Sequence, residues 1–73
     1  MVRKALFKCP RSRKFLYCAE YDNYITFWSG FSDEPDDNIT NWIEENNLAK
    51  KYPKSDYFDR FVKLHSRTLV KIK

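Results

Sequence analysis

Three short runs of strand-forming residues near the start of the chain constrain its fold most strongly. They span residues 5–9, 15–19 and 24–28, and β-branched and aromatic residues dominate them. Asp22-Asn23 separates the second run from the third, and both residue types tolerate the left-handed backbone of a two-residue hairpin. A polar, basic stretch at residues 10–14 separates the first run from the second. The sequence therefore predicts a three-stranded antiparallel meander.

The turn positions also set the expected strand register. A two-residue hairpin at Asp22-Asn23 pairs Tyr17 with Trp28. A loop centred between residues 13 and 14 would bring Cys9 opposite Cys18. Both cysteines are expected to be reduced thiols, because the chain shows no secretory signal and is expected in the cytoplasm.

Two helices are expected after the meander. Carboxylates and a proline at residues 33–37 suit a helix start, and Ile39, Trp42 and Ile43 then share one helical face. Tyr52-Pro53 ends this helix, because a proline forces the preceding residue out of helical geometry. A second helix begins at Ser55. Its apolar stripe consists of Phe58, Phe61, Val62 and His65.

Apolar and polar residues alternate again in residues 68–73 and predict a short closing strand. Its lysines are expected to disfavour pairing of this edge with another chain. The predicted order is β-β-β-α-α-β, in a single α+β domain covering residues 1–73. Both helices are expected to pack on one face of an antiparallel sheet.

Strand alternation divides the side chains of the meander between two faces. One face is almost free of polar atoms and is expected to form the core beneath the helices. It holds Ala5, Phe7, Cys9, Leu16, Cys18, Ile25, Phe27 and Phe31. Two short helices cover one sheet face, so the opposite face is expected to stay open. The alternative is a register error, which would bury the side chains of the open face and expose those of the core face.

The expected partner-binding site combines the open face with the basic tip of the first hairpin. Tyrosine and tryptophan rings are typical of binding surfaces, and the basic tip would attract an acidic partner. The site consists of Leu6, Arg11, Arg13, Lys14, Tyr17, Tyr24 and Trp28.

Charge is sorted along the chain into three blocks. Residues 1–14 carry six bases and no acid, residues 15–49 carry eight acids and no base, and residues 50–73 carry eight bases and two acids. Such a surface presents different faces to different partners. The alternative is that the blocks neutralise each other within the fold.

Catalysis is not expected from this sequence. The single histidine lies on a helix stripe, and nucleophile elbows, phosphate-binding glycine loops and zinc-ligand spacings are missing. We therefore expect a non-enzymatic monomer with no catalytic residue, cofactor or metal. No apolar run approaches 18 residues, so no membrane span is expected.

Two binding functions remain open. A protein-binding regulator suits mixed charge around an aromatic centre, and an exposed sheet edge could also accept a partner segment as an added strand. A single-stranded nucleic-acid binder would use the basic hairpin loop for phosphates and Tyr17, Tyr24 and Trp28 for stacking. Glu20 and Asp22 oppose the second function, because they place negative charge at the end of the same sheet.

The segment Val2-Arg3-Lys4-Ala5-Leu6-Phe7-Lys8-Cys9-Pro10, continued through Phe31, resembles small lytic-phage transcription regulators that bind host bacterial RNA polymerase. The likeness extends over the whole chain in length and general character. It implies a single domain that docks near the start of the polymerase β′ subunit, in the host cytoplasm. It also implies a weakened hold of the σ factor, blocked promoter initiation, and antitermination. No catalytic residue is implied.

Overall fold

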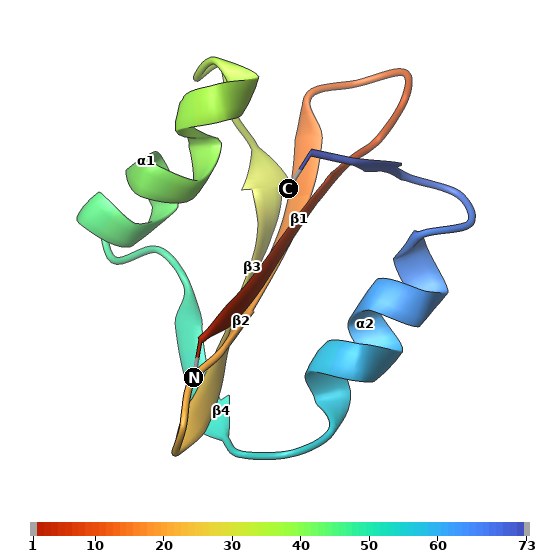
Figure 1. The fold of residues 1–73 in the computed structure, drawn as a ribbon. Coiled ribbons are helices and arrows are strands. Elements are labelled where there is room, and N and C mark those ends of the chain that lie inside the picture. The colour runs from red at the N-terminus through yellow and green to blue at the C-terminus, as the bar shows by residue number, and fades with distance from the viewer. Residues whose placement is uncertain (1, 73) are drawn as a thin grey trace.

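The computed structural model describes residues 2–72, which form a five-stranded antiparallel sheet between two helices (Figure 1). The spatial order of the strands is β4-β3-β2-β1-β5. In chain order the elements are β1 (Arg3–Lys8), β2 (Lys14–Glu20), β3 (Tyr24–Phe31), the 3-10 turn η1 (Asp36–Asn38), α1 (Ile39–Glu45), β4 (Lys50–Pro53), α2 (Tyr57–His65) and β5 (Val70–Lys71). The predicted α+β class, with an antiparallel sheet and two helices, is confirmed.

The second hairpin has the predicted register, with Tyr17 opposite Trp28. The first hairpin does not, because its turn is centred between residues 11 and 12. The Cys9 backbone N–H donates to the Lys14 carbonyl at 2.9 Å, and Cys18 lies opposite Ala5 instead of Cys9. Pro10 explains the shift, since its fixed φ suits the second position of a tight turn that begins at Cys9.

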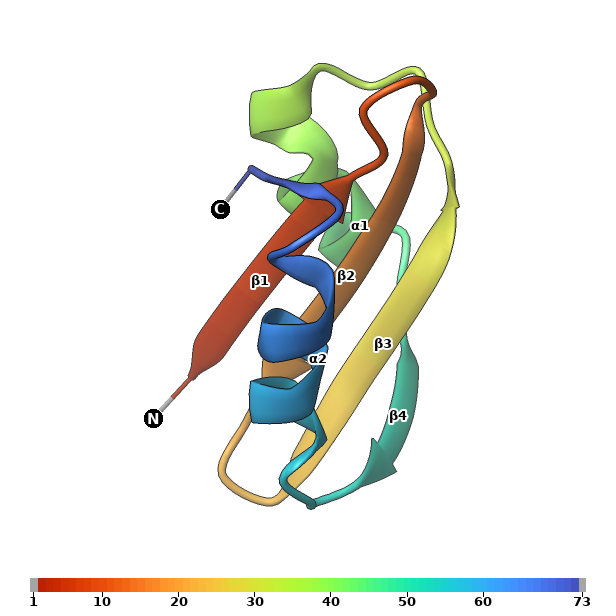
Figure 2. The same ribbon diagram turned by 90° about the vertical axis from the view of Figure 1, so that its right-hand side faces the viewer.

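The two helices lie on opposite faces of the sheet, so the prediction that both cover one face is wrong (Figures 1 and 2). α1 packs with Leu6 and Tyr17, whereas α2 packs with Phe7 and Cys18. The sequence carried a signal for this arrangement, since strands buried on both faces read as continuous apolar runs. Residues 5–7 and 15–19 are such runs.

β4 was not predicted, and it explains how the helices reach different faces. The first helix ends at Glu45, and Lys50–Pro53 then pairs with β3 at the sheet edge. From that edge the chain crosses the other face as α2 and reaches β5 at the opposite edge (Figure 2). Lys50 and Lys51 therefore lie in a strand, where we expected the C-terminal turn of a helix.

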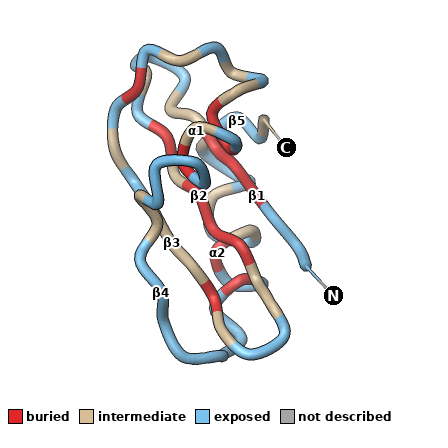
Figure 3. Tube along the Cα trace, turned by 90° about the vertical axis from the view of Figure 1, so that its left-hand side faces the viewer, coloured by how far each residue is buried: buried red, intermediate tan, exposed pale blue. Residues whose placement is uncertain are grey.

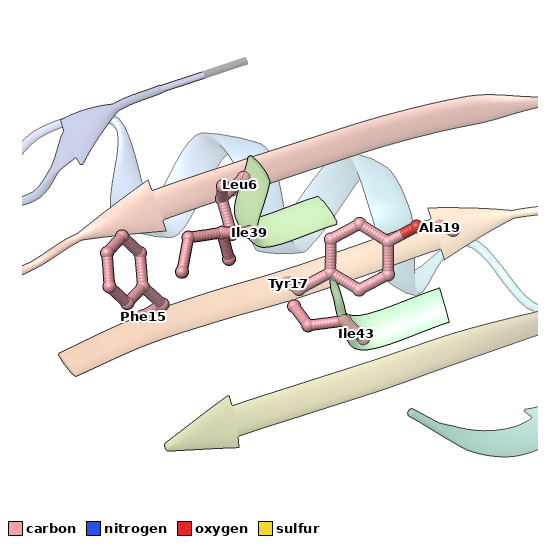
Figure 4. Close-up of a cluster of buried hydrophobic side chains, with 6 residues drawn as sticks. All are labelled: Leu6, Phe15, Tyr17, Ala19, Ile39 and Ile43. Atoms are coloured by element: carbon pink, nitrogen blue, oxygen red, sulfur yellow. The ribbon is translucent and has the colours of Figure 1, made fainter. Parts of the chain in front are cut away.

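The core consists of two apolar clusters separated by the sheet, and its buried residues concentrate in β1 and β2 (Figure 3). The α1-side cluster contains Leu6, Phe15, Tyr17, Ala19, Ile39 and Ile43 (Figure 4). The α2-side cluster contains Ala5, Phe7, Cys18, Phe58 and Phe61. Within residues 2–72, no helix combines the length and apolarity needed to cross a bilayer.

Candidate partner-binding site

The aromatic face that we expected to be open is covered by α1. Leu6 is 0% exposed and Tyr17 is 1% exposed, so neither side chain can contact a partner in this fold. The Trp28 ring packs edge-on against Trp42 of α1, with the ring centroids 5.5 Å apart. Trp28 also lies over Gly30, where an added Cβ would come within 2.8 Å of the indole. The β1 and β2 residues of the expected open face are therefore buried, whereas Tyr24 and Trp28 of β3 are partly exposed.

The three basic residues of the expected site have different environments. The Arg13 side chain is half-buried and fastens the segment after β3: its Nε donates to the Ser32 carbonyl at 2.8 Å, and its Nη2 lies 3.1 Å from Asp36 Oδ1. Arg11 and Lys14 are exposed at the hairpin tip. Arg13 is thus occupied within the fold, whereas Arg11 and Lys14 are accessible.

Tyr24 lies at a polar hollow beside the α1-side cluster. This hollow has a volume of about 440 Å³. The Tyr24 ring stacks on Tyr21 at 4.8 Å, and the Lys51 ammonium lies 4.1 Å from the centroid of the Tyr24 ring. At the same hollow, the Tyr17 hydroxyl donates to Glu44 Oε2 at 2.8 Å, and Lys4 Nζ lies 2.6 Å from that oxygen.

Burial, together with the nearby Glu44 carboxylate, raises the pKa of Tyr17 above its usual range. The phenol therefore keeps its proton and remains the donor to Glu44 at neutral pH. Lys4 supplies the compensating positive charge. The contacts of Glu44 with Tyr17 and Lys4 lie within the domain and join α1 to the sheet.

Most bases of the first charge block are neutralised by acids of the second, as the alternative interpretation predicted, but the exposed Asp33, Asp37 and Glu45 lie outside these pairs. Four of the six bases in residues 1–14 pair with acids of residues 15–49. The pairs are Arg3–Glu20, Lys4–Glu44, Lys8–Asp36 and Arg13–Asp36. Each is partly exposed, so each contributes at most about 1 kcal/mol to stability. Their main consequence is that most bases of residues 1–14 are not free to bind a partner.

Positive charge without a carboxylate partner remains mainly in the last third of the chain. Among the described residues, no ion pair involves Lys50, Lys51, Lys63 or Arg67. Lys50 and Lys51 belong to β4, while Lys63 and Arg67 lie in α2 and just after it. The segment containing α1 carries six acids and no base between residues 32 and 49. Acids therefore gather in the segment containing α1, whereas the unpaired bases Lys63 and Arg67 lie on α2 and just after it.

An apolar groove opens beside β4, on the face of the strand that carries Lys50 and opposite the face that carries Lys51, and we call it the β4 groove. Its volume is about 490 Å³. The apolar lining comes from β3, β4 and α2 and consists of Ile25, Phe27, Tyr52, Pro53 and Tyr57. Tyr52 is 43% exposed and Tyr57 is 37% exposed, so two large rings reach the surface here. An exposed apolar surface beside unpaired cations is the feature of this chain best suited to bind a partner.

Sequence reasoning missed the β4 groove because it assigned Lys50–Pro53 to a helix end. No alternation marks this four-residue segment, and its strand conformation depends on pairing with β3. Tyr52 and Tyr57 also fall in different predicted elements, so nothing in the sequence brought them together.

Comparisons of this chain with protein-family models, with curated proteins and with solved structures found no match. Among residues 2–72, no three histidine, cysteine, aspartate or glutamate side chains are grouped to hold a metal ion.

Proposed function

We propose that this protein is a non-catalytic regulator that binds bacterial RNA polymerase through the β4 groove and the lysines beside it. As the resemblance to the phage regulators implies, docking takes place near the start of the β′ subunit. Binding there interferes with the σ factor, inhibits initiation and promotes antitermination.

The β4 groove is the single observation that supports a protein partner most directly. It combines exposed tyrosine rings with an apolar floor, and such rings supply much of the affinity in protein interfaces. Lys50 and Lys51 add charge that has no carboxylate partner within the described chain. This charge would accelerate encounter with an acidic surface.

The acidic α1 side supports interference with promoter engagement. Asp33, Asp37 and Glu45 are exposed there, and residues 32–49 carry no base. A protein held on the polymerase by its β4 edge would bring this negative surface close to the enzyme's DNA path. Phosphates approaching that surface would be repelled.

A nucleic-acid function has one specific observation in its favour, the basic outer side of α2. Arg60, Lys63 and Arg67 line a shallow hollow there with the exposed Leu64. Three cations in a row suit a phosphate backbone. The stacking platform predicted for single-stranded binding is covered by α1, however, so phosphate contacts would have to supply the affinity.

Two charge-matched variants separate these functions. Lys50→Glu/Lys51→Glu alters the β4 edge, and Lys63→Glu/Arg67→Glu makes the same charge change on α2. The tagged proteins are tested for capture of purified RNA polymerase core enzyme and for effects on σ-dependent initiation and termination in vitro. We expect the β4 variant to lose about tenfold or more in polymerase affinity, because it replaces attraction by repulsion. The α2 variant should bind nearly as the wild type does.

The outcome that contradicts the proposal is failure of the wild-type protein to bind polymerase. The nucleic-acid function would replace it if the protein binds DNA or RNA with an affinity that falls steeply with salt. In that case the α2 variant should lose binding, and the β4 variant should retain more of it.

A further inference from the structure

We infer that β4 accepts an extended acidic segment of the partner as an added strand, with one apolar side chain of that segment in the β4 groove. This inference rests on the proposed function, because it names the part of the partner that the β4 groove contacts. The occupant is an acidic peptide segment, and the argument starts from the backbone of β4.

The hydrogen bond that closes the second hairpin fixes which backbone groups of β3 point toward β4. The Tyr21 backbone N–H donates to the Tyr24 carbonyl at 2.8 Å, so the backbone groups of Tyr24 face β2. In an antiparallel sheet successive residues alternate between the two neighbours. Ile25 and Phe27 therefore direct their N–H and C=O groups toward β4.

The partners of Ile25 and Phe27 in β4 are Tyr52 and Lys50, which direct their backbone groups inward. Lys51 and Pro53 consequently direct theirs outward, away from the sheet. β4 is the last strand on this side of the sheet in the described chain. The Lys51 N–H, the Lys51 carbonyl and the Pro53 carbonyl are thus available to an added strand.

Pro53 fits this assignment. Proline has no backbone N–H, and within sheets it is found where that group would face solvent. Here the missing donor falls on the outer side, so pairing with β3 is unaffected. It also limits how far an added strand can be hydrogen-bonded, so affinity must come from side chains as well.

The side chains beside the free edge define the preferred segment. Tyr52 shares a face with Ile25 and borders the groove, whereas Lys51 lies on the other face, over Tyr24. An added strand would place alternate residues on these two faces. A large apolar residue on the groove side would cover Tyr52, and acidic residues on the other face would meet Lys51, with the charge of Lys50 close to the groove side.

Lysines on an edge strand have a general protective effect against strand-to-strand aggregation. This protection depends on the charge of the approaching strand, because Lys50 and Lys51 repel a second positive edge but attract a negative one. A second copy of β4 brings the same two lysines and no acid. The charge pattern therefore opposes self-pairing through β4 and favours an acidic segment.

The test uses a fluorescein-labelled nine-residue peptide in which glutamates alternate with valine and a central phenylalanine. A matched peptide carries lysine at every glutamate position. Fluorescence anisotropy should give at least tenfold tighter binding of the acidic peptide. Amide hydrogen exchange should slow at Lys51, whose N–H gains a partner, with no comparable change at Arg11 on the hairpin tip. Equal binding of both peptides, or unchanged exchange at Lys51, would overturn the inference.

Lys51→Pro removes the outward donor without removing a hydrogen bond to β3, and its fold is checked by circular dichroism. We expect it to weaken acidic-peptide binding, and Lys50→Glu/Lys51→Glu to abolish it. The second variant keeps the test decisive if the proline variant does not fold. Self-association of the wild type through β4 in sedimentation experiments would also overturn the inference.

These results are separable from the proposed function. If polymerase is captured equally by the wild type and by both β4 variants, the added-strand inference and the docking through β4 are wrong, and only the binding of polymerase survives. If the acidic peptide binds β4 but polymerase is not captured, the proposed partner is wrong and the strand-binding edge remains.

Discussion

The two helical layers are attached to the same sheet by different kinds of interaction. On the α1 side, buried aliphatic contacts are bordered by polar links such as Lys4–Glu44 at 2.6 Å and Tyr17–Glu44 at 2.8 Å. On the α2 side, Phe61 packs edge-on against Phe7 and Phe27, with the ring centroids 5.5 and 5.9 Å apart. The α2 layer also has a polar link, the Arg3–Asp59 pair at 2.9 Å, but its aromatic packing ends at an open apolar groove.

This difference indicates which side is available for binding. Ion pairs to Glu20, Asp36 and Glu44 occupy four of the six bases of residues 1–14, so most of this basic block is not free to bind a partner. The α2 side keeps unpaired cations and exposed rings, including Tyr52 and Tyr57. Both sides contribute buried core residues, and the groove that we propose as the binding site lies on the α2 side.

The largest expected effect tests whether aromatic packing holds the α2 layer. Phe61→Ala removes a ring that is 1% exposed and should destabilise the protein by about 3–5 kcal/mol. A domain of this size is only marginally stable, so this variant should be largely unfolded at room temperature. Urea unfolding followed by circular dichroism measures the change. Leu64→Ala, on the same helix but 67% exposed, is the control and should lie within about 0.5 kcal/mol of the wild type. Similar losses in both would show that α2 is not anchored through Phe61.

A smaller effect should distinguish two arginines that the sequence placed in one site. Arg13→Ala breaks the hydrogen bond to the Ser32 carbonyl and the contact with Asp36, so we expect a loss of about 1–2 kcal/mol. Arg11→Ala, at the exposed tip of the same hairpin, should change stability by less than about 0.5 kcal/mol. Both are measured by thermal unfolding at equal salt. If the two arginines prove equivalent, the fastening of the segment after β3 contributes nothing measurable.

The smallest expected effect is a loss of stability at alkaline pH that depends on Cys18. Burial, with a lesser contribution from Glu20, raises the pKa of Cys18 from 9.0 to about 11. Because the folded state holds this proton more tightly, its stabilising contribution is complete below pH 9 and is lost as the pH rises through 11. Urea midpoints from pH 8 to 11 should therefore fall more steeply for the wild type than for Cys18→Ala. The raised pKa of Tyr17 acts in the same direction in both proteins and cancels in the comparison. Parallel curves would contradict this account of Cys18.

Much of the fold could be predicted because local chemistry determined it. The turn at Asp22-Asn23 placed Tyr17 opposite Trp28, and the apolar spacing of Ile39 and Ile43 located α1. A loop centred between residues 13 and 14 predicts the wrong register for the first hairpin. Pro10 starts the turn earlier along the chain. Two residues of the expected binding site, Leu6 and Tyr17, are buried because α1 covers the face that was expected to stay open.

Residue order alone was enough to predict the strands of the meander, the two helices and the separation of charge along the chain. These features depend on residue spacing, on turn conformation and on the order of charged residues, all of which act over a few positions. Three features could be read only from the folded chain: the helices cover opposite faces, bases of the first charge block pair with acids of the second, and β4 forms an edge beside an apolar groove. Those outcomes depend on contacts between residues far apart in the chain. A sheet with two apolar faces is compatible with several helix placements until those contacts select one.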